Sequence, residues 1–313
     1  MRVLLTGGSG FVGQYVLSRL ISTKLEILAT SSPLNDQERI VAGNLRWLQC
    51  DLSEPPSYSR SIIEFEPDVV IHLAWQGIPN YSAEISGLNL RNSASFLNLV
   101  ATETACTQLV IAGSCMEYQR DWVSREIDAF PRIGEKGSFL AWAKNSLRDY
   151  CFLLGAEKGM NVAWLRIFYV YGSGQRAGAL IPTLISAATS GTGFELKNPE
   201  NQNDFVYVKD VAEAIVLATM AESSINGIYD VGSGNLTAIR DICSFVEHEI
   251  TGKTSNKSLM SKKGIGPGGS VNIEPIVADL KGIKKELDWE PEWKLEDGIR
   301  ETINLHLTTH QSS

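Results

Sequence analysis

The sequence contains no long apolar run and little positive charge. No stretch approaches the roughly 20 mostly apolar residues of a membrane-spanning helix. The apolar start ends in glycines too soon for a secretory signal, so we expect a soluble, cytoplasmic protein. The 28 basic residues are outnumbered by 36 acidic ones, which gives a net charge of −8. That balance argues against a nucleic acid-binding surface, which is normally basic.

Cysteine and histidine are few and scattered. The five cysteines are an odd number and form no Cys-x-x-Cys pair, so a disulfide framework is not expected. The four histidines show no His-Glu-x-x-His spacing or similar pattern. We therefore expect free thiols and no bound metal.

Apolar residues make up 43% of the 313 positions, enough for one large core or two unequal ones. Short apolar or β-rich runs lie at residues 2–6, 25–29, 46–50, 69–73, 109–112 and 162–168. Helical patterns lie between them, notably at residues 11–21, 89–104 and 139–154. Strands that alternate with helices at this spacing predict an α/β fold with a doubly wound, Rossmann-like parallel sheet.

The second half of the chain is richer in glycine and serine. These residues cluster at 171–178, 190–193, 227–235 and 261–270, and helices are expected near 180–188, 209–221, 237–250 and 295–306. We place a dinucleotide-binding domain at residues 1–170 and a smaller C-terminal α/β substrate-binding domain at residues 171–313. Some exchange of chain between the two is expected.

The turn after the first strand reads Gly-x-x-Gly-x-x-Gly. In such a loop, one glycine permits a tight turn, one lets the backbone approach a pyrophosphate and one allows close helix–sheet contact. The helix that follows directs its positive end at the phosphates. An ordinary strand–helix turn is the alternative, but the context favours dinucleotide binding. The predicted contacts are Gly7, Gly10, Phe11, Val12 and Gly13.

The choice between NAD and NADP depends on the end of the second strand. Thr30 and Ser31 occupy it, so no carboxylate is present to hold a ribose hydroxyl or to repel a 2′-phosphate. No Arg or Lys is adjacent to neutralise a 2′-phosphate, but the two hydroxyls can form hydrogen bonds with it. We therefore favour NADP over NAD. Asp51, followed by Leu52, is placed either to contact the adenine or to cap a helix.

Several segments together resemble the extended short-chain dehydrogenase/reductases, the epimerase/dehydratase group that acts on sugar nucleotides. Residues 6–13, 50–52, 72–74, 112–118, 166–172, 204–212 and 287–291 resemble family signatures in order and spacing, over nearly the whole chain. The resemblance implies that Leu73, Ala74 and Asn89 lie at the cofactor. It also implies that Ser114 is the catalytic hydroxyl.

The resemblance breaks at the family's catalytic pair, Tyr-x-x-x-Lys. Lys144 is present, but Leu140 stands where the tyrosine should be. In the family the lysine holds the nicotinamide ribose and the tyrosine moves a proton, which leucine cannot do. Tyr169, where the family usually has Asn, is either a displaced acid or a filler of the vacated space. Tyr118, Cys115, Glu117 and solvent are weaker candidates for the proton donor.

Two positions bear on the substrate. Arg176 follows the sixth strand and can bind a diphosphate bidentately, or it is a solvated loop residue. Asn203 replaces the arginine that the family often has before its Asp-Phe pair. This neutral residue leaves open which nucleotide the substrate carries and whether it carries one. The Gly-rich loop at 261–270, with its two lysines, is either a substrate cover or only flexible. His72 is expected to pack or to form hydrogen bonds rather than to catalyse.

The resemblance implies an NAD(P)-dependent enzyme whose substrate is a nucleotide-linked sugar. C4 ketoreduction of a 4-keto-6-deoxy sugar is favoured, followed by epimerisation at C4 and then dehydration, because Cys115 and Met116 replace the acidic residues of a dehydratase. A non-catalytic, NAD(P)-binding regulatory protein and an enzyme that acts on a non-sugar carbonyl are the alternatives. The family often forms homodimers through two helices per subunit, here 89–104 and 139–154.

Overall fold

The computed structural model describes residues 1–32, 39–119, 137–192, 196, 198–221, 225–252 and 275–311. The chain divides into two compact units. The first unit comprises Met1–Ile167, Val211–Val231 and Lys281–Trp289, and the second comprises Phe168–Asp210, Gly232–Leu280 and Glu290–Ser313. The division thus falls after Ile167, and two later segments return to the first unit. The loop at 261–270 lies outside the described residues.

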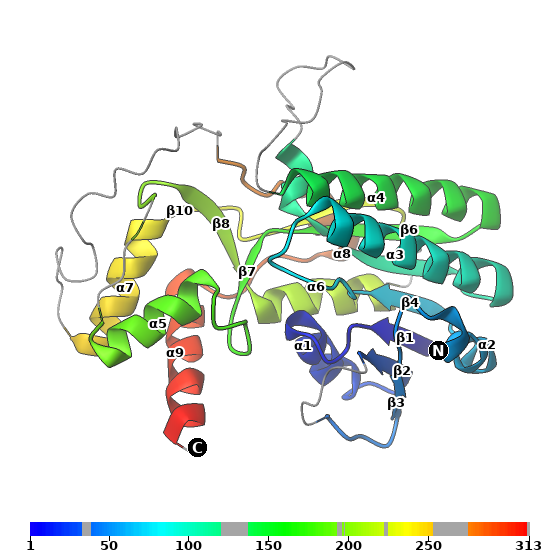
Figure 1. The fold of residues 1–313 in the computed structure, drawn as a ribbon, viewed down its shortest axis with the longest axis horizontal. Helices are drawn as coiled ribbons and strands as arrows, with labels where there is room; N and C mark the ends of the chain where they lie inside the picture. Colours follow the sequence, from blue (N-terminus) through cyan, green and yellow to red (C-terminus); the bar gives the residue numbers. More distant parts are fainter. Residues whose placement is uncertain are drawn as a thin grey trace, which may run out of the picture. The chain divides into compact units, whose positions relative to one another are not determined.

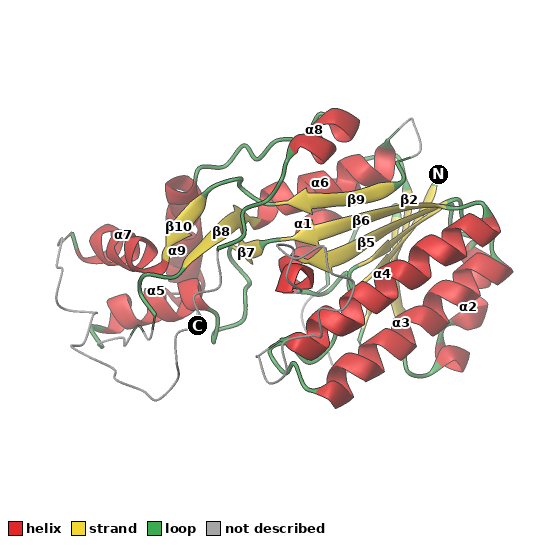
Figure 2. Cartoon of the chain, turned by 90° about the horizontal axis from the view of Figure 1, so that it is seen from above, coloured by secondary structure: helices red, strands yellow, loops and turns green. Residues whose placement is uncertain are grey.

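The first unit is built on a seven-stranded sheet in the order β3-β2-β1-β4-β5-β6-β9, with every neighbouring pair parallel. Its strands are β1 (Arg2–Thr6), β2 (Glu26–Ser31), β3 (Leu45–Gln49), β4 (Val69–His72), β5 (Gln108–Ser114), β6 (Asn161–Ile167) and β9 (Gly227–Val231). The doubly wound parallel sheet is confirmed, since helices cover both of its faces (Figure 2). The central strands read as apolar runs because both of their faces are buried.

The helices of this unit are α1 (Phe11–Leu20), α2 (Ser59–Phe65), α3 (Ala83–Glu103), α4 (Ser138–Lys158), α6 (Val208–Met220) and α8 (Lys281–Leu287), with short 3-10 turns η1 (Pro55–Ser57) and η2 (Cys115–Gln119). Side chains of α2, α3 and α4 share one apolar core with β1, β4, β5 and β6. Phe96, Leu147 and Trp164 are fully buried in it. α6 lies on the opposite face of the sheet (Figures 1 and 2).

The second unit contains a three-stranded sheet in the order β10-β8-β7. Its elements are β7 (Tyr169–Tyr171), α5 (Leu180–Ser190), β8 (Gln202–Tyr207), β10 (Leu236–Ala238), α7 (Ile239–Thr251) and α9 (Leu295–Gln311). β7 and β8 are parallel, whereas β8 and β10 are antiparallel. α7 packs against both α5 and α9.

Two aspartates within residues 204–212, one of the segments that resemble a family signature, bind the backbone of other segments. The buried carboxylate of Asp204 accepts hydrogen bonds from the amides of Ser233, Gly234 and Ala278. The carboxylate of Asp210 accepts from the amides of Glu292 and Trp293. These bonds satisfy buried backbone donors from segments far apart in the sequence, and they tie those segments to β8 and the start of α6.

Two elements of the second half differ from what the sequence pattern indicates. Residues 227–231 lie in one of the Gly- and Ser-rich clusters, but they form β9, the strand next to β6 in the large sheet. The helix expected from residue 237 begins at Ile239, because residues 236–238 pair with β8. Both strands are short and lie among glycines and serines, so their pairing depends on strands distant in sequence rather than on local propensity.

Candidate cofactor and catalytic site

The glycine loop between β1 and α1 has the geometry of a phosphate cradle. Gly7 adopts φ +73°, and a Cβ there would lie 2.9 Å from the amide nitrogen of Ala74. A Cβ on Gly13 would lie 2.1 Å from the carbonyl oxygen of Gly7, so only glycine lets α1 approach the loop this closely. Gly10 is the N-cap of α1 and, having no side chain, forms no capping bond to the first turn. The amides there suit the pyrophosphate of a dinucleotide.

The segment after β4 is fixed beside this loop. The hydroxyl of Thr6 accepts from the amide of Ala74 (3.3 Å) and is bonded to Nδ1 of His72 (2.8 Å). Nε2 of His72 is bonded to Ser93, and its ring stacks on Phe96. Burial, with the positive charge of Lys144, lowers the pKa of His72 to about 3. His72 is thus a neutral packing residue, as expected from the sequence.

Asn89 acts on the same segment from α3. Its side-chain oxygen accepts from the amide of Gln76 (2.9 Å), and its amide nitrogen donates to the carbonyl oxygens of Gln76 (3.0 Å) and Ile85 (2.8 Å). The amide of Asn89 is therefore engaged with the backbone. Any effect of Asn89 on a cofactor passes through the position of residues 73–77.

The ends of β2 and β3 form the edge of the site nearest the glycine loop. Thr30 and Ser31 are buried, and Ser31 Oγ has no hydrogen-bond partner within the described ranges of the chain. A Cβ on Gly8 would contact Trp47, and the guanidinium of Arg39 lies over the Trp47 ring at 5.7 Å. Arg39 was not predicted as a cation of this edge, because it lies eight residues beyond the end of β2 in the sequence. In the structure its contact with the Trp47 ring places it there.

Asp51 follows β3, and its side chain accepts from the amide (2.9 Å) and the hydroxyl (2.7 Å) of Ser53. It therefore closes its own turn. The alternative that Asp51 caps a helix is wrong, because α2 begins at Ser59 with Tyr58 at its N-cap. Asp51 itself is exposed, and its neighbour Leu52 packs partly against the apolar core.

Ser114 and Lys144 are both held at the end of β5. The hydroxyl of Ser114 accepts from the amide of Met116, and Nζ of Lys144 donates to the carbonyl oxygen of Ala112 at 2.7 Å. The same ammonium lies 3.8 Å from the centre of the Trp75 ring. Burial lowers the pKa of Lys144 to about 8, against the opposing influence of Glu117. Leu140, one turn earlier on α4, is only 4% exposed.

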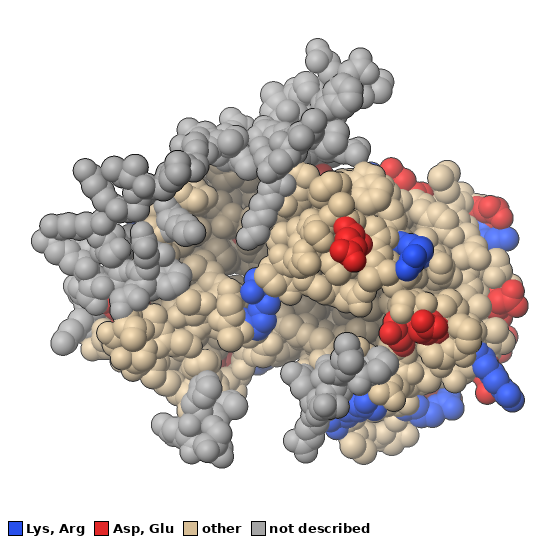
Figure 3. All heavy atoms as spheres, viewed as in Figure 1, with Lys and Arg blue, Asp and Glu red and all other residues tan. Residues whose placement is uncertain are grey.

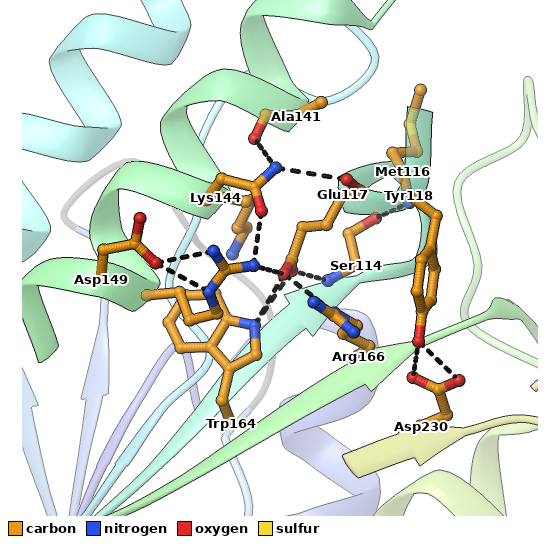
Figure 4. Close-up of polar contacts among 12 residues, drawn as sticks. Ser114, Met116, Glu117, Tyr118, Ala141, Lys144, Asp149, Trp164, Arg166 and Asp230 are labelled. Atoms are coloured by element: carbon orange, nitrogen blue, oxygen red, sulfur yellow. Dashed lines mark hydrogen bonds and ion pairs between the residues drawn. The ribbon is translucent and has the colours of Figure 1, made fainter. Parts of the chain in front are cut away.

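Glu117 lies beneath Ser114 at the centre of a polar cluster (Figure 4). Glu117 is 2% exposed as a residue, and its carboxylate accepts hydrogen bonds from the Ser114 amide, Nε1 of Trp164 and Nε of Arg166. Arg148 forms an ion pair with it at 3.6 Å. From the sequence, Glu117 was only a weak candidate for the proton donor. In the structure it is an acceptor surrounded by donors.

Tyr118 points toward β9. Its hydroxyl donates to both carboxylate oxygens of Asp230, at 2.8 and 2.9 Å (Figure 4). The Arg166 guanidinium lies over its ring. Burial, followed by the charge of Asp230, raises the pKa of Tyr118 to about 12. These contacts give Tyr118 a structural role.

The other predicted substrate residues belong to the second unit. Tyr169, in β7, is 46% exposed and packs against Phe205. Arg176 lies in the turn before α5, where its carbonyl oxygen accepts from the amide of Ala179. Asn203 is paired in register with Thr237. The structure groups these three residues in one unit, and Ser114 and Lys144 in the other.

Other kinds of site find no support among the described residues. None of the described His, Cys, Asp and Glu side chains gather in a group of three that could hold a metal ion. None of the described helices has both the length and the apolar character needed to cross a bilayer. Along the right-hand edge of Figure 3, acidic and basic side chains lie next to one another.

Known proteins with similar sequences act on sugar nucleotides. The chain is 24% identical to a dTDP-glucose 4,6-dehydratase of Haemophilus influenzae, over 100% of both chains. It is 23% identical to a dTDP-4-dehydro-6-deoxyglucose reductase of Escherichia coli, over 96% of each. The structure superposes on UDP-glucose 4-epimerase of Thermus thermophilus, solved with NAD, with a TM-score of 0.78 and 25% identity, over 97% of this chain and 98% of that one.

The glycine cradle, the parallel sheet and the residues at the end of β5 all lie within the region that a single family model matches, residues 3–232. The resemblance inferred from the sequence is thereby confirmed. The chain belongs to the NAD dependent epimerase/dehydratase family.

Proposed function

We propose that this chain is an NAD(P)-dependent oxidoreductase that reduces the C4 keto group of a nucleotide-linked 4-keto-6-deoxy sugar. The observation that carries the proposal is the pairing of Ser114 and Lys144 at the end of β5, both fixed by hydrogen bonds. When bound, a reduced nicotinamide would supply the hydride. Ser114 donates a hydrogen bond to the reacting oxygen, and Lys144 holds the nicotinamide ribose and adds positive potential.

The residues that follow Ser114 favour reduction over dehydration. Cys115 and Met116 carry no carboxylate, so neither supplies the acid and base that removal of water from a sugar needs. Epimerisation at C4 is the closer alternative, and the two reactions differ in stoichiometry. A reductase consumes one reduced nicotinamide per sugar, whereas an epimerase returns its cofactor to the starting state.

Leu140 leaves the reaction without the family's proton carrier, and we assign that role to Tyr169. The partial exposure of its phenol supports this assignment. Tyr169→Phe removes only the hydroxyl, so it is expected to lower kcat by about 100-fold or more while KM changes little. An unchanged kcat would return Tyr169 to a space-filling role.

For the cofactor, we propose contacts from the glycine loop, the end of β2 and the segment after β4. The proposed residues are Gly7, Gly10, Phe11, Val12, Gly13, Thr30, Ser31, Asp51, Leu52, Leu73, Ala74 and Lys144, with Asn89 acting through the backbone. We favour NADP, because the guanidinium of Arg39, over the Trp47 ring, offers a positive charge for a 2′-phosphate. We assign Arg176 and Asn203 to the nucleotide diphosphate.

A homodimer through α3 and α4 is also proposed. Phe139, Trp142 and Leu153 are exposed on α4, and their spacing places them on one side of the helix. Such a stripe is typical of a surface that a second copy covers. Leu153→Glu is expected to convert a dimer into a monomer in light scattering, whereas a wild-type protein that is already monomeric would exclude the assembly.

The second candidate is a non-catalytic, NAD(P)-binding regulatory protein, which the missing tyrosine favours. One experiment separates it from the reductase. Nicotinamide fluorescence is followed as NADH and NADPH are titrated, and a panel of 4-keto and 4-hydroxy sugar nucleotides is then added. Oxidation of the cofactor by a 4-keto sugar supports the reductase, whereas tight binding without turnover across the panel supports the regulatory protein.

A further inference from the structure

One buried carboxylate links β5 and α4, which carry Ser114 and Lys144, with the neighbouring strand β6. Glu117 lies in η2, directly after β5, and its side chain meets β6 through Trp164 and Arg166 and α4 through Arg148. All of these residues belong to the first unit. A buried carboxylate is costly unless cations and donors surround it, and here the two guanidinium groups and two N–H groups do so.

The first link runs to Ser114. A carboxylate oxygen of Glu117 accepts from the Ser114 amide at 2.7 Å, a short, charge-assisted bond. No side chain fits on the residue before it, because a Cβ on Gly113 would lie 2.3 Å from Trp164 Nε1 and 2.6 Å from Oε1 of Glu117. The backbone that carries the Ser114 hydroxyl is therefore fixed against this carboxylate.

The second link runs to the turn of α4 that carries Lys144. Asn145 donates from Nδ2 to the backbone carbonyl oxygen of Glu117 at 3.3 Å, and its Oδ1 accepts from Nη1 of Arg148 at 2.5 Å. The same Nη1 pairs with the Glu117 carboxylate. Glu117, Asn145 and Arg148 thus form a closed ring of polar contacts that fixes α4 against the end of β5.

The third link is electrostatic. Three titratable groups act on the Lys144 ammonium: Glu117 from η2, Cys151 from its own helix and His72 from β4. Burial keeps the Cys151 thiol protonated, since it raises the pKa of that thiol to about 12, and His72 is neutral. Glu117 has the largest of the charge effects that raise the pKa of Lys144. It opposes the effect of burial on Lys144.

We propose that Glu117 is a positioning residue that sets the Ser114 hydroxyl and the Lys144 ammonium in register. The catalytic part of this inference rests on the proposed function. The electrostatic part concerns Lys144 alone and is measurable in protein without cofactor or substrate.

The test compares Glu117→Gln with Glu117→Asp. The pH dependence of acylation of Lys144, followed by mass spectrometry of the cofactor-free protein, reports the protonation of its amine. Glu117→Gln removes the charge, so the midpoint for Lys144 is expected to move to lower pH. Glu117→Asp keeps the charge but is shorter by one methylene, so the midpoint should stay near the wild-type value. Both variants should lower kcat, by about 100-fold for a displacement on the order of 1 Å.

Circular dichroism and thermal unfolding establish that each variant is folded. Glu301→Gln is the matched control, because it removes a carboxylate that accepts from Tyr207 and Lys209 in the other unit. Should Glu117→Gln not fold, Arg148→Met opens the same ring with the carboxylate intact, and it should lower kcat without moving the Lys144 midpoint to lower pH.

An unmoved Lys144 midpoint in folded Glu117→Gln would overturn the electrostatic link, and a wild-type kcat in either variant at Glu117 would overturn the positioning role. If wild-type protein turns over no sugar nucleotide, the proposed function fails. The acylation midpoint still decides whether Glu117 governs the protonation of Lys144.

Discussion

Replacing Gly13 with alanine tests whether the close approach of α1 to its loop creates the dinucleotide site. The new Cβ would lie 2.1 Å from the Gly7 carbonyl oxygen, where ordinary contact begins at 3.4 Å. The helix and the loop must therefore separate by about 1.3 Å. The atoms that the new Cβ meets belong to the backbone of Gly7 and Gly8, so no side-chain rotation relieves the contact. Overpacking of this kind costs about 1–3 kcal/mol of unfolding free energy.

The loss should be larger for the cofactor than for the fold. Loss of one hydrogen bond to a charged phosphate oxygen costs about 1.5–3 kcal/mol, so the dissociation constant for NADPH is expected to rise roughly 10- to 150-fold. Urea denaturation and a fluorescence titration measure the two effects. Gly87→Ala is the matched control, because it lies in α3 with nothing within 4 Å of the added Cβ. It should gain about 0.5–1 kcal/mol and bind NADPH normally. If Gly13→Ala binds as tightly as the control, the reasoning about the cradle is refuted.

Three further predictions concern single side chains. The unfolded chain holds the Lys144 proton up to a pKa near 10.5 and the folded chain only to about 8, so the contribution of Lys144 to the unfolding free energy should rise with pH between these values; urea curves of wild type and Lys144→Met measure this, and a constant difference between them would contradict it. Arg39→Gln should weaken NADPH binding more than NADH binding in a fluorescence titration. Arg46→Gln is the control, since Arg46 lies near the start of β3 over the Phe65 ring, and equal losses for both cofactors would exclude the proposed phosphate contact. Leu140→Tyr should raise kcat about 100-fold or more if the vacated position accepts a working phenol; an unchanged rate would show that the proton moves by another route.

The features that the sequence predicted best are those whose cause is local. Gly7 requires a positive φ and Gly13 requires the absence of a Cβ, and both requirements follow from the spacing of the loop alone. The central strands of the first half, β1, β4 and β5, are largely apolar and buried, and they are bounded by turns. Their positions in a parallel sheet therefore followed from pattern, with ends that shifted by one or two residues.

The features that the sequence missed depend on distant partners. β9 is a five-residue strand, and its neighbour β6 lies some sixty residues earlier. Glu117 stands directly before Tyr118 in a stretch that resembles a family signature, but its partners Trp164 and Arg166 come from another strand and Arg148 from a helix. The residues next to Glu117 in the sequence do not indicate that its carboxylate is buried and surrounded by donors from three different elements.

The discontinuous make-up of the first unit has a consequence for synthesis on the ribosome. A nascent chain that has reached Ile167 lacks β9 and α8, so β6 is still an open edge with unpaired backbone groups. Gln108, buried in β5, still lacks the carbonyl oxygen of Ala218 to which its side chain donates. The nucleotide-binding half of the chain is therefore completed only after residue 289 has emerged, and a fragment cut near residue 170 should aggregate rather than fold.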